Sequence, residues 1–156
     1  MPKTVNPIPK GYEGVTPYLI CRNAEAAIEF YQRAFGAEEL FRIGEPGIVG
    51  HCEMKIGNAI FMLADEHLEQ GAVSPQGIGG TAVQLMVYVE DVDAFTQQAV
   101  AEGLSELRPV STMFYGDRSG QYRDPFGHVW AFATHLEDVS PEEMNTRAAA
   151  LYGGHG

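Results

Sequence analysis

The same strand and helix pattern occurs twice in this sequence, and the repeat limits the possible folds more than any other feature. One copy begins at Val15 and the other at Ala82, so the second starts 67 residues after the first. Self-similarity at a fixed period indicates a repeated supersecondary unit. In each copy an apolar stretch suited to a strand is followed by apolar residues at helical spacing. The chain is therefore predicted to contain two related modules.

The two predicted helices have recognisable ends. Asn23 and Asp91 are residue types that cap helix N-termini, because their side-chain oxygens accept hydrogen bonds from free backbone N–H groups. Gly36 and Gly103 follow the apolar stripes and suit the left-handed turn that ends many helices. The buried stripes are predicted to be Ala24, Ala27, Ile28, Tyr31, Ala34 and Phe35 in the first helix, and Val92, Phe95 and Ala99 in the second.

Short strands with turn residues between them precede and follow each helix. Gly57-Asn58 is suited to a tight hairpin turn, and residues 124–127 (Asp-Pro-Phe-Gly) to a longer one. The predicted strands are 15–21, 38–43, 50–56 and 59–65 in the first module, and 83–89, 107–113, 120–123 and 128–134 in the second. The fold class is therefore α+β, with two βαβββ modules.

The length of 156 residues suits a single domain spanning 1–156. Within it we expect module 1 at about 15–65, an exposed linker at 66–80 and module 2 at about 82–135. Ser140 as a cap, followed by Pro141, predicts a C-terminal helix over about 140–152 that docks on the body or on a second subunit. One helix covers one face of a four-stranded sheet, so the other faces of the two sheets should pack together or enclose a cavity.

Charge and composition exclude several kinds of partner. With 10 basic and 21 acidic residues the formal charge is −11, which disfavours nucleic acid and anionic membrane surfaces. Neither a secretion signal nor an apolar run long enough for a membrane span is found, so we expect a cytoplasmic protein. Cys21 and Cys52 lie far apart in apolar stretches and are expected to be reduced core residues.

Several segments together resemble the vicinal oxygen chelate superfamily, and within it the PhnB-like branch. They are residues 15–19 (VTPYL), 27–31 (AIEFY), 35–37 (FGA), 61–65 (FMLAD), 88–93 (YVEDVD), 114–120 (FYGDRSG) and 124–130 (DPFGHVW). This superfamily includes glyoxalase I, fosfomycin and bleomycin resistance proteins and extradiol dioxygenases. The resemblance implies a glyoxalase-like, cup-shaped mixed sheet around a pocket, a homodimer, and in the metalloenzymes a divalent ion held by both modules.

The resemblance also places the metal-ligand positions. Counted from the helix and the final glycine turn, they fall on Thr16, Phe61, Gln84 and Ala131. Of these, Gln84 alone is of a type that such sites use, because Phe and Ala carry no donor atom and Thr is a poor neutral one. We therefore expect no metal and no other cofactor.

A ligand pocket is predicted from two polar motifs and from the inward strand faces that the resemblance implies. His51 and Glu53 are two apart on one strand and share a face, whether as a structural pair, an acid/base pair or part of a displaced metal site. Tyr115 and Asp117 lie in a glycine-bounded stretch that either closes over a pocket or is held structurally, with Asp117 and Arg118 paired. The expected ligand-binding residues are Thr16, Tyr18, His51, Glu53, Phe61, Gln84, Met86, Tyr115 and Asp117.

The remaining aromatic and histidine residues are assigned to the core and the surface. Because the resemblance places Ala131 at an inward ligand position, alternation along the last strand implies that Trp130 and Phe132 lie under the helix. His128, His135 and His155 have no partner at metal-ligand spacing and are expected on the surface.

The leading interpretation is a homodimer that binds a small organic molecule without a metal. A metal-dependent lyase, isomerase or dioxygenase with displaced ligands, starting from His51, Glu53 and Gln84, is the alternative. A structural or interaction module with a filled pocket is the third. No catalytic residue is assigned.

Overall fold

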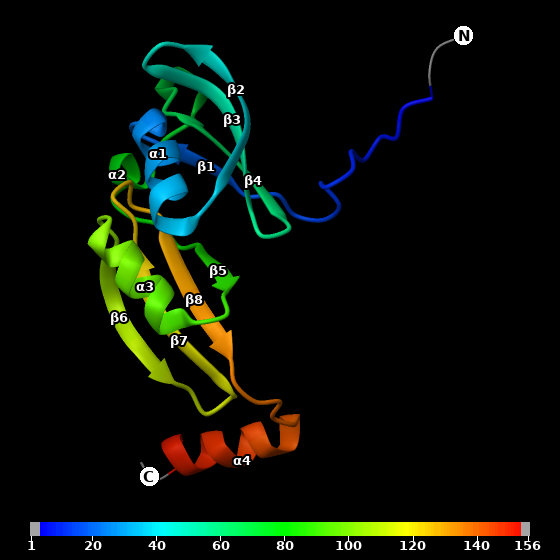
Figure 1. The fold of residues 1–156 in the computed structure, drawn as a ribbon, viewed down its shortest axis with the longest axis vertical. Coiled ribbons are helices and arrows are strands. Elements are labelled where there is room, and N and C mark those ends of the chain that lie inside the picture. The colour runs from blue at the N-terminus through cyan, green and yellow to red at the C-terminus, as the bar shows by residue number, and fades with distance from the viewer. Residues whose placement is uncertain (1–3, 154–156) are drawn as a thin grey trace. The chain divides into compact units, whose positions relative to one another are not determined.

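The computed structural model describes residues 4–153. Contacts within the chain divide it after Gly80 into two compact units. Each unit contains one four-stranded sheet and one helix of ten or more residues packed on that sheet (Figure 1). The units are described separately below.

The first unit has the βαβββ order predicted from the repeat. Its elements are β1 (Tyr18–Cys21), α1 (Ala24–Phe35), β2 (Glu38–Glu45), β3 (Ile48–Ile56) and β4 (Ala59–Asp65). The strands lie in the order β1-β4-β3-β2, with β1 parallel to β4 and the other pairs antiparallel. Gly57 (φ 57°) supplies the positive φ that the tight turn between β3 and β4 requires.

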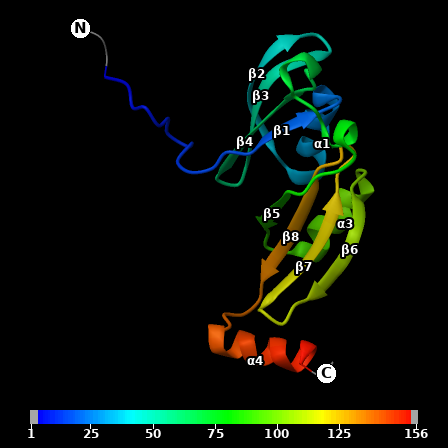
Figure 2. The ribbon, with the colours of Figure 1, turned by 180° about the vertical axis from the view of Figure 1, so that it is seen from behind.

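The second unit repeats this topology. Its elements are β5 (Gln84–Tyr88), α3 (Val92–Ala101), β6 (Ser105–Thr112), β7 (Asp117–Arg123) and β8 (Val129–His135). The strand order β5-β8-β7-β6 matches that of the first sheet, again with one parallel pair (Figure 2). The α+β class and the two repeated modules are thus confirmed. The expected strand over 120–123 begins earlier, at Asp117.

Each helix packs on one face of its own sheet. In the first unit Tyr31 of α1 contacts Phe61 of β4, with ring centroids 5.8 Å apart. In the second, Phe95 of α3 contacts Phe132 of β8 at 4.8 Å, which confirms that Phe132 lies under the helix. Residues paired across neighbouring strands share a face, and alternate residues along a strand point to opposite faces. We call the face opposite the helix the open face of each sheet.

The ends of α1 form as its sequence predicts. The Asn23 side chain accepts a hydrogen bond from the Ala26 N–H at 3.2 Å, and Gly36 adopts the left-handed conformation with φ 66°. Cys21 and Cys52 are fully buried and are not joined in a disulfide, as expected.

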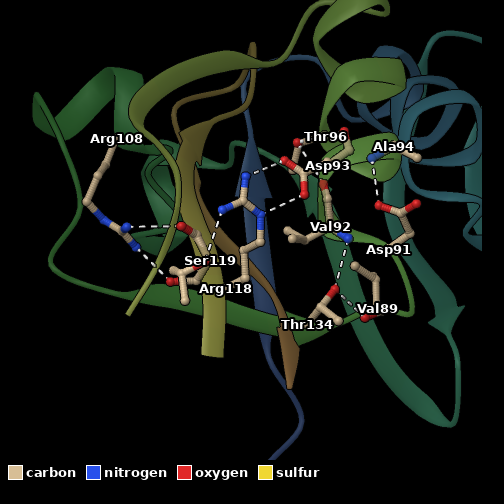
Figure 3. Close-up of polar contacts among 11 residues, drawn as sticks. Val89, Asp91, Val92, Asp93, Ala94, Thr96, Arg108, Arg118, Ser119 and Thr134 are labelled. Atoms are coloured by element: carbon tan, nitrogen blue, oxygen red, sulfur yellow. Dashed lines mark hydrogen bonds and ion pairs between the residues drawn. The ribbon is translucent and has the colours of Figure 1, made fainter. Parts of the chain in front are cut away.

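In each unit, one side chain near the end of β4 or β8, the strand parallel to the edge strand, connects the helix to the sheet. Asp65 accepts hydrogen bonds from the backbone N–H groups of Ala24 and Val49, both at 2.7 Å. In the second unit the Thr134 hydroxyl accepts from the Val92 N–H at 2.8 Å and donates to the Val89 carbonyl at 2.9 Å (Figure 3). These contacts fix where each helix starts relative to its sheet.

The expected C-terminal helix is present as α4 (Pro141–Tyr152), with Ser140 as its cap. Arg147 of α4 donates to the Phe114 carbonyl at 3.0 Å and pairs with Glu137 at 2.6 Å, so α4 docks on the second unit. The stretch 66–80 is not wholly exposed, because Ser74 and Pro75 are buried at the start of the short helix α2 (Pro75–Ile78). None of the helices described is both long and apolar enough to cross a membrane.

We predict that Asp65→Ala lowers the free energy of unfolding by about 2–4 kcal/mol, because two buried N–H groups lose a charged acceptor. The midpoint of urea unfolding measures the effect. The control is Glu69→Ala, since Glu69 is an exposed acidic residue. Equal midpoints for the two variants would show that the Asp65 bonds add nothing to stability.

Candidate functional site on the open faces

A hydrogen-bonded row of three side chains lies on the open face of the first sheet. The Tyr18 hydroxyl is 2.8 Å from Nδ1 of His51, and Nε2 of His51 is 3.0 Å from Oε2 of Glu53. Glu53 pairs with Met62, which in turn pairs with Tyr18, so these residues share the face opposite α1. Tyr18 belongs to the edge strand β1 and reaches across β4 to contact β3. The expected pairing of His51 with Glu53 is therefore present, and Tyr18 joins it.

The chemistry of Glu53 sets the direction of these hydrogen bonds. A carboxylate only accepts, so Nε2 of a neutral His51 carries the hydrogen and donates it to Glu53. Nδ1 is then an acceptor, and Tyr18 donates to it. Glu53 is only 7% exposed, whereas Tyr18 is 47% exposed. Burial raises the pKa of Tyr18, so its hydroxyl keeps its proton at neutral pH.

Exposed apolar side chains continue this row. Phe41 lies next to His51 with ring centroids 5.7 Å apart, and Tyr18 lies on the other side of that imidazole at 5.5 Å. Phe41 is 46% exposed, and Ile43, which pairs with His51, is 60% exposed. The open face of the first sheet thus combines a fixed polar centre with accessible apolar surface.

A second network has the same plan on the open face of the second sheet. The Tyr88 hydroxyl donates to Oδ2 of Asp117 at 2.7 Å, and Oδ1 of Asp117 is 2.8 Å from Nδ1 of His135. Nε2 of His135 is 2.7 Å from Asp138. Tyr88 belongs to the edge strand β5 and reaches across β8 to β7, as Tyr18 does between the corresponding strands of the first sheet. Both units therefore hold a tyrosine across the central strand.

Burial and charge distinguish the members of this second network. Asp117 is 5% exposed. Both ring nitrogens of His135 face carboxylates, and these hydrogen bonds, that to Asp117 first, raise the pKa of His135. The pKa of Tyr88 is also raised, chiefly because its hydroxyl donates to Asp117. His135 therefore gains a proton more readily than an ordinary histidine, and Tyr88 loses its proton less readily than an ordinary tyrosine.

The other expected ligand-binding residues lie near these networks or beside them. Gln84 and Met86 alternate with Tyr88 on the open side of β5, and Met86 is 50% exposed. Tyr115 precedes β7 and lies close enough to Tyr88 to contribute to its raised pKa. Thr16 is half-buried and precedes β1 rather than lying within a strand.

The expected orientation of Phe61 is wrong. Phe61 is 5% exposed and its ring packs on Tyr31 of α1, so it lies on the helix face. The cause is a difference in the face on which each hairpin closes. The closing pair Ile56 and Ala59 of the first unit lies on the helix face, whereas the pair Arg123 and Val129 of the second lies on the open face, so the same count from the glycine reaches opposite faces. Met62, which pairs with Tyr18, occupies the open-face position.

The structure also gives the hydrogen-bond partners of Arg118 and Asp124. Asp117 and Arg118 do not pair with each other, because they are consecutive strand residues on opposite faces. Arg118 instead forms a two-bond ion pair with Asp93 of α3, at 2.7 and 2.9 Å (Figure 3). Asp124 accepts from the Trp130 indole N–H at 2.9 Å and from two backbone N–H groups of its own turn, which is a structural function.

Two members of the second network were missed by sequence reasoning. Tyr88 lies in an apolar strand, yet continuing the alternation of Gln84 and Met86 by one step predicts it on the open face. His135 is expected on the surface without a partner at metal-ligand spacing; it is indeed exposed, but it contacts two carboxylates. Asp117 lies 18 residues from His135, so no local motif reveals the contact. His155 lies outside the described residues.

The donor set does not fit the divalent metal of the superfamily's metalloenzymes. Thr16, Gln84 and Ala131 stand where ligands are expected, and the fourth position holds Met62 in place of the predicted Phe61. A lone amide oxygen with a neutral hydroxyl is too weak a set for a stable zinc, nickel or iron site. Over residues 4–153, no group of three or more His, Cys, Asp or Glu side chains is arranged to hold a metal ion.

Comparison with solved structures defines the fold class of this chain. TioX from Micromonospora sp. ML1 superimposes with a TM-score of 0.63 and 27% identity, covering 82% of this chain and 100% of TioX. The fosfomycin resistance protein FosX from Listeria monocytogenes, solved in complex with Mn(II) and sulfate, gives 0.59 and 19% identity over 87% of this chain and 98% of FosX. The latter likeness concerns the fold alone. Two βαβββ modules with open sheets are thus a glyoxalase-like fold.

Sequence comparison then identifies the family. Residues 15–132 match the Glyoxalase/Bleomycin resistance protein/Dioxygenase superfamily. Uncharacterized proteins of Mycobacterium bovis and Mycobacterium tuberculosis are each 34% identical over 144 residues; the match covers 90% of this chain and 95% and 85%, respectively, of those proteins. The chain therefore belongs to the Glyoxalase/Bleomycin resistance protein/Dioxygenase superfamily.

We predict that His135 makes the stability of the protein depend on pH. Because folding raises the pKa of His135, its stabilising effect is complete below the ordinary histidine pKa of about 6.5 and is lost as the pH rises through the higher folded value. The urea midpoint of the wild type should exceed that of His135→Gln at about pH 5.5, and the difference should shrink by pH 8. His67→Gln is the control, because His67 is exposed. A difference that grows with pH would contradict the assignment.

Proposed function

We propose that this protein binds a small organic molecule on the open faces of its sheets, and that it carries or sequesters this molecule without a divalent metal. The observation that supports the proposal most strongly is the repeated arrangement of a fixed edge-strand tyrosine beside exposed apolar side chains. Tyr18 and Phe41 form it in the first sheet, and Tyr88 and Met86 in the second.

The physical properties of these surfaces suit ligand recognition. Binding sites for small molecules are mostly apolar, with a few polar groups at fixed positions that orient the ligand. His51 fixes the Tyr18 hydroxyl and Asp117 fixes that of Tyr88, so both polar groups are pre-organised. Large exposed apolar side chains grouped on one face indicate an interaction surface rather than ordinary protein surface.

The metal-independent part of the proposal rests on the weak donor set described above. Superfamily enzymes that use a Lewis acid or activate oxygen need a firmly held ion. Membership of the PhnB-like branch, a homodimeric state and a cytoplasmic location stay predictions from the sequence.

We predict that the purified, untagged protein retains much less than one ion per chain after incubation with Zn, Ni, Mn or Fe(II) and desalting. Its melting temperature should not rise with any of these metals. Elemental analysis and thermal unfolding measure the two quantities. One ion per chain with clear stabilisation would contradict the proposal. Loss of that ion in a His51→Ala, Glu53→Ala double variant would then locate a displaced site.

We predict that the neutral aromatic probe 1-naphthamide binds to the open faces. In ¹H–¹⁵N NMR titrations, saturable shifts should appear in β1 to β4 of the first sheet and in β5 and β8 of the second. Phe41→Ser should weaken binding to the first sheet and Met86→Ser binding to the second, each by about fivefold, because about 1 kcal/mol of apolar contact is lost. Both side chains are about half exposed, so the substitutions spare the core.

The matched control for these variants is Leu151→Ser, which removes a 55% exposed apolar side chain from α4. It should leave the affinity for 1-naphthamide unchanged. Shifts confined to α4, or full affinity in both the Phe41→Ser and Met86→Ser variants, would refute binding on the open faces.

A further inference from the structure

We infer that Arg108 of β6 is a binding point for an oxyanion, and that the ligand of the second sheet is an organic acid whose carboxylate meets this guanidinium. The inference rests on the proposed function, because it names the ligand class for one of the two open faces.

Arg108 is held over the open face by Ser119. Its Nη1 donates to the Ser119 carbonyl at 3.0 Å, and its Nη2 donates to the Ser119 hydroxyl at 3.1 Å (Figure 3). Ser119 pairs with Ala133, and its neighbour Gly120 pairs with Phe132 of the helix face, so Ser119 belongs to the open face. Two bonds to one residue fix the plane of the guanidinium before any ligand arrives.

The remaining donors of Arg108 form a free fork. A guanidinium has five N–H groups. The second hydrogen of Nη1 points to Sδ of Met113, at 3.8 Å. The Nε–H and the outer hydrogen of Nη2 are left, and they lie on the same edge of the group. That edge matches the two oxygens of a carboxylate. No acceptor within residues 4–153 meets it.

The charge of Arg108 is also uncompensated. The chain has 21 acidic residues against 10 basic ones, and Arg42, Arg118 and Arg147 all pair with carboxylates. Arg108 is half-buried, and over the described part of the chain its acceptors are a carbonyl, a hydroxyl and a thioether. A partly desolvated cation without a counter-ion favours the arrival of an anion.

The neighbouring side chains indicate what kind of anion fits. Asp117 lies two residues before Ser119 on the same face, but its oxygens are engaged by Tyr88 and His135. Beside Ser119 and Gln121 of β7, β8 presents the methyl groups of Ala133 and Ala131, which lie between β7 and the side chains of β5. Two strand spacings, about 10 Å, separate β7 from β5. An acid with an apolar body of about two fused rings spans this distance.

The test is an NMR titration of the full chain with 1-naphthoate at pH 6, with 1-naphthamide as its neutral counterpart. The Nε–H cross-peak of Arg108 is assigned as the one missing in Arg108→Lys. We expect it to move saturably with 1-naphthoate and to stay in place with 1-naphthamide. Arg108→Gln should raise the Kd for 1-naphthoate about tenfold, which corresponds to a loss of about 1.4 kcal/mol of binding free energy. The affinity of Arg108→Lys for 1-naphthoate should lie between those of the wild type and Arg108→Gln, because an ammonium keeps the charge but lacks the paired N–H groups of a guanidinium.

The matched control is Arg33→Gln on the exposed surface of α1, which changes the net charge equally and should leave the affinity for 1-naphthoate unchanged. An unmoved Arg108 cross-peak, or equal losses in Arg33→Gln and Arg108→Gln, would overturn the inference. If 1-naphthamide still shifts β5 and β8, the proposed function survives that result. If neither probe shifts either open face, both proposals fail.

Discussion

Each unit of this protein has one helix of more than two turns on its sheet, and a sheet has two faces. The helix buries the large apolar side chains of one face, such as Phe61 in the first unit and Phe132 in the second. The opposite face is left with residues that the helix cannot cover, and their character decides what the surface does. Here that face carries histidine, carboxylate and tyrosine side chains beside exposed apolar ones. The candidate site is therefore a consequence of each helix covering only one of the two faces of its sheet.

The hydrogen bonds at the ends of the central strands keep the two faces distinct. Asp65 and Thr134 hold the first turn of each helix against its own sheet through backbone N–H groups. A helix fixed at its start cannot slide along the sheet, so the same side chains remain on the open face. Residues on the helix faces thus help to keep Tyr18 and Tyr88 on the open faces. This is the usual division between a packed scaffold and the site that it positions.

Much of the fold followed from local sequence signals because those signals act over a few residues. Asn23 and Gly36 bound α1, Ser140 starts α4, and the Gly57 turn joins β3 to β4, each through the physics of its own neighbours. The His51 and Glu53 pair was predictable for the same reason, since two residues on one strand always share a face.

The rest of the site depends on registers that local patterns do not contain. The face of Phe61 does not follow from the count because the closing pairs of the two hairpins lie on opposite faces, and a shift of one residue exchanges the faces of a strand. The contacts of Tyr88 with Asp117, and of Asp117 with His135, join residues on three different strands. Such contacts appear only when the strands are aligned side by side.

The direction of the tyrosine hydrogens has a consequence for recognition. Tyr88 gives its hydrogen to Asp117, and Tyr18 gives its hydrogen to His51 while that imidazole is neutral. Each phenol therefore turns its lone pairs, and not its hydrogen, toward an incoming molecule. A carbonyl or ether oxygen placed there would meet like partial charge, whereas an amine, amide or hydroxyl would supply the missing hydrogen. A ligand on the proposed site would thus be selected by polarity: the two open faces would tell apart two compounds of the same shape that differ only in whether one position donates or accepts.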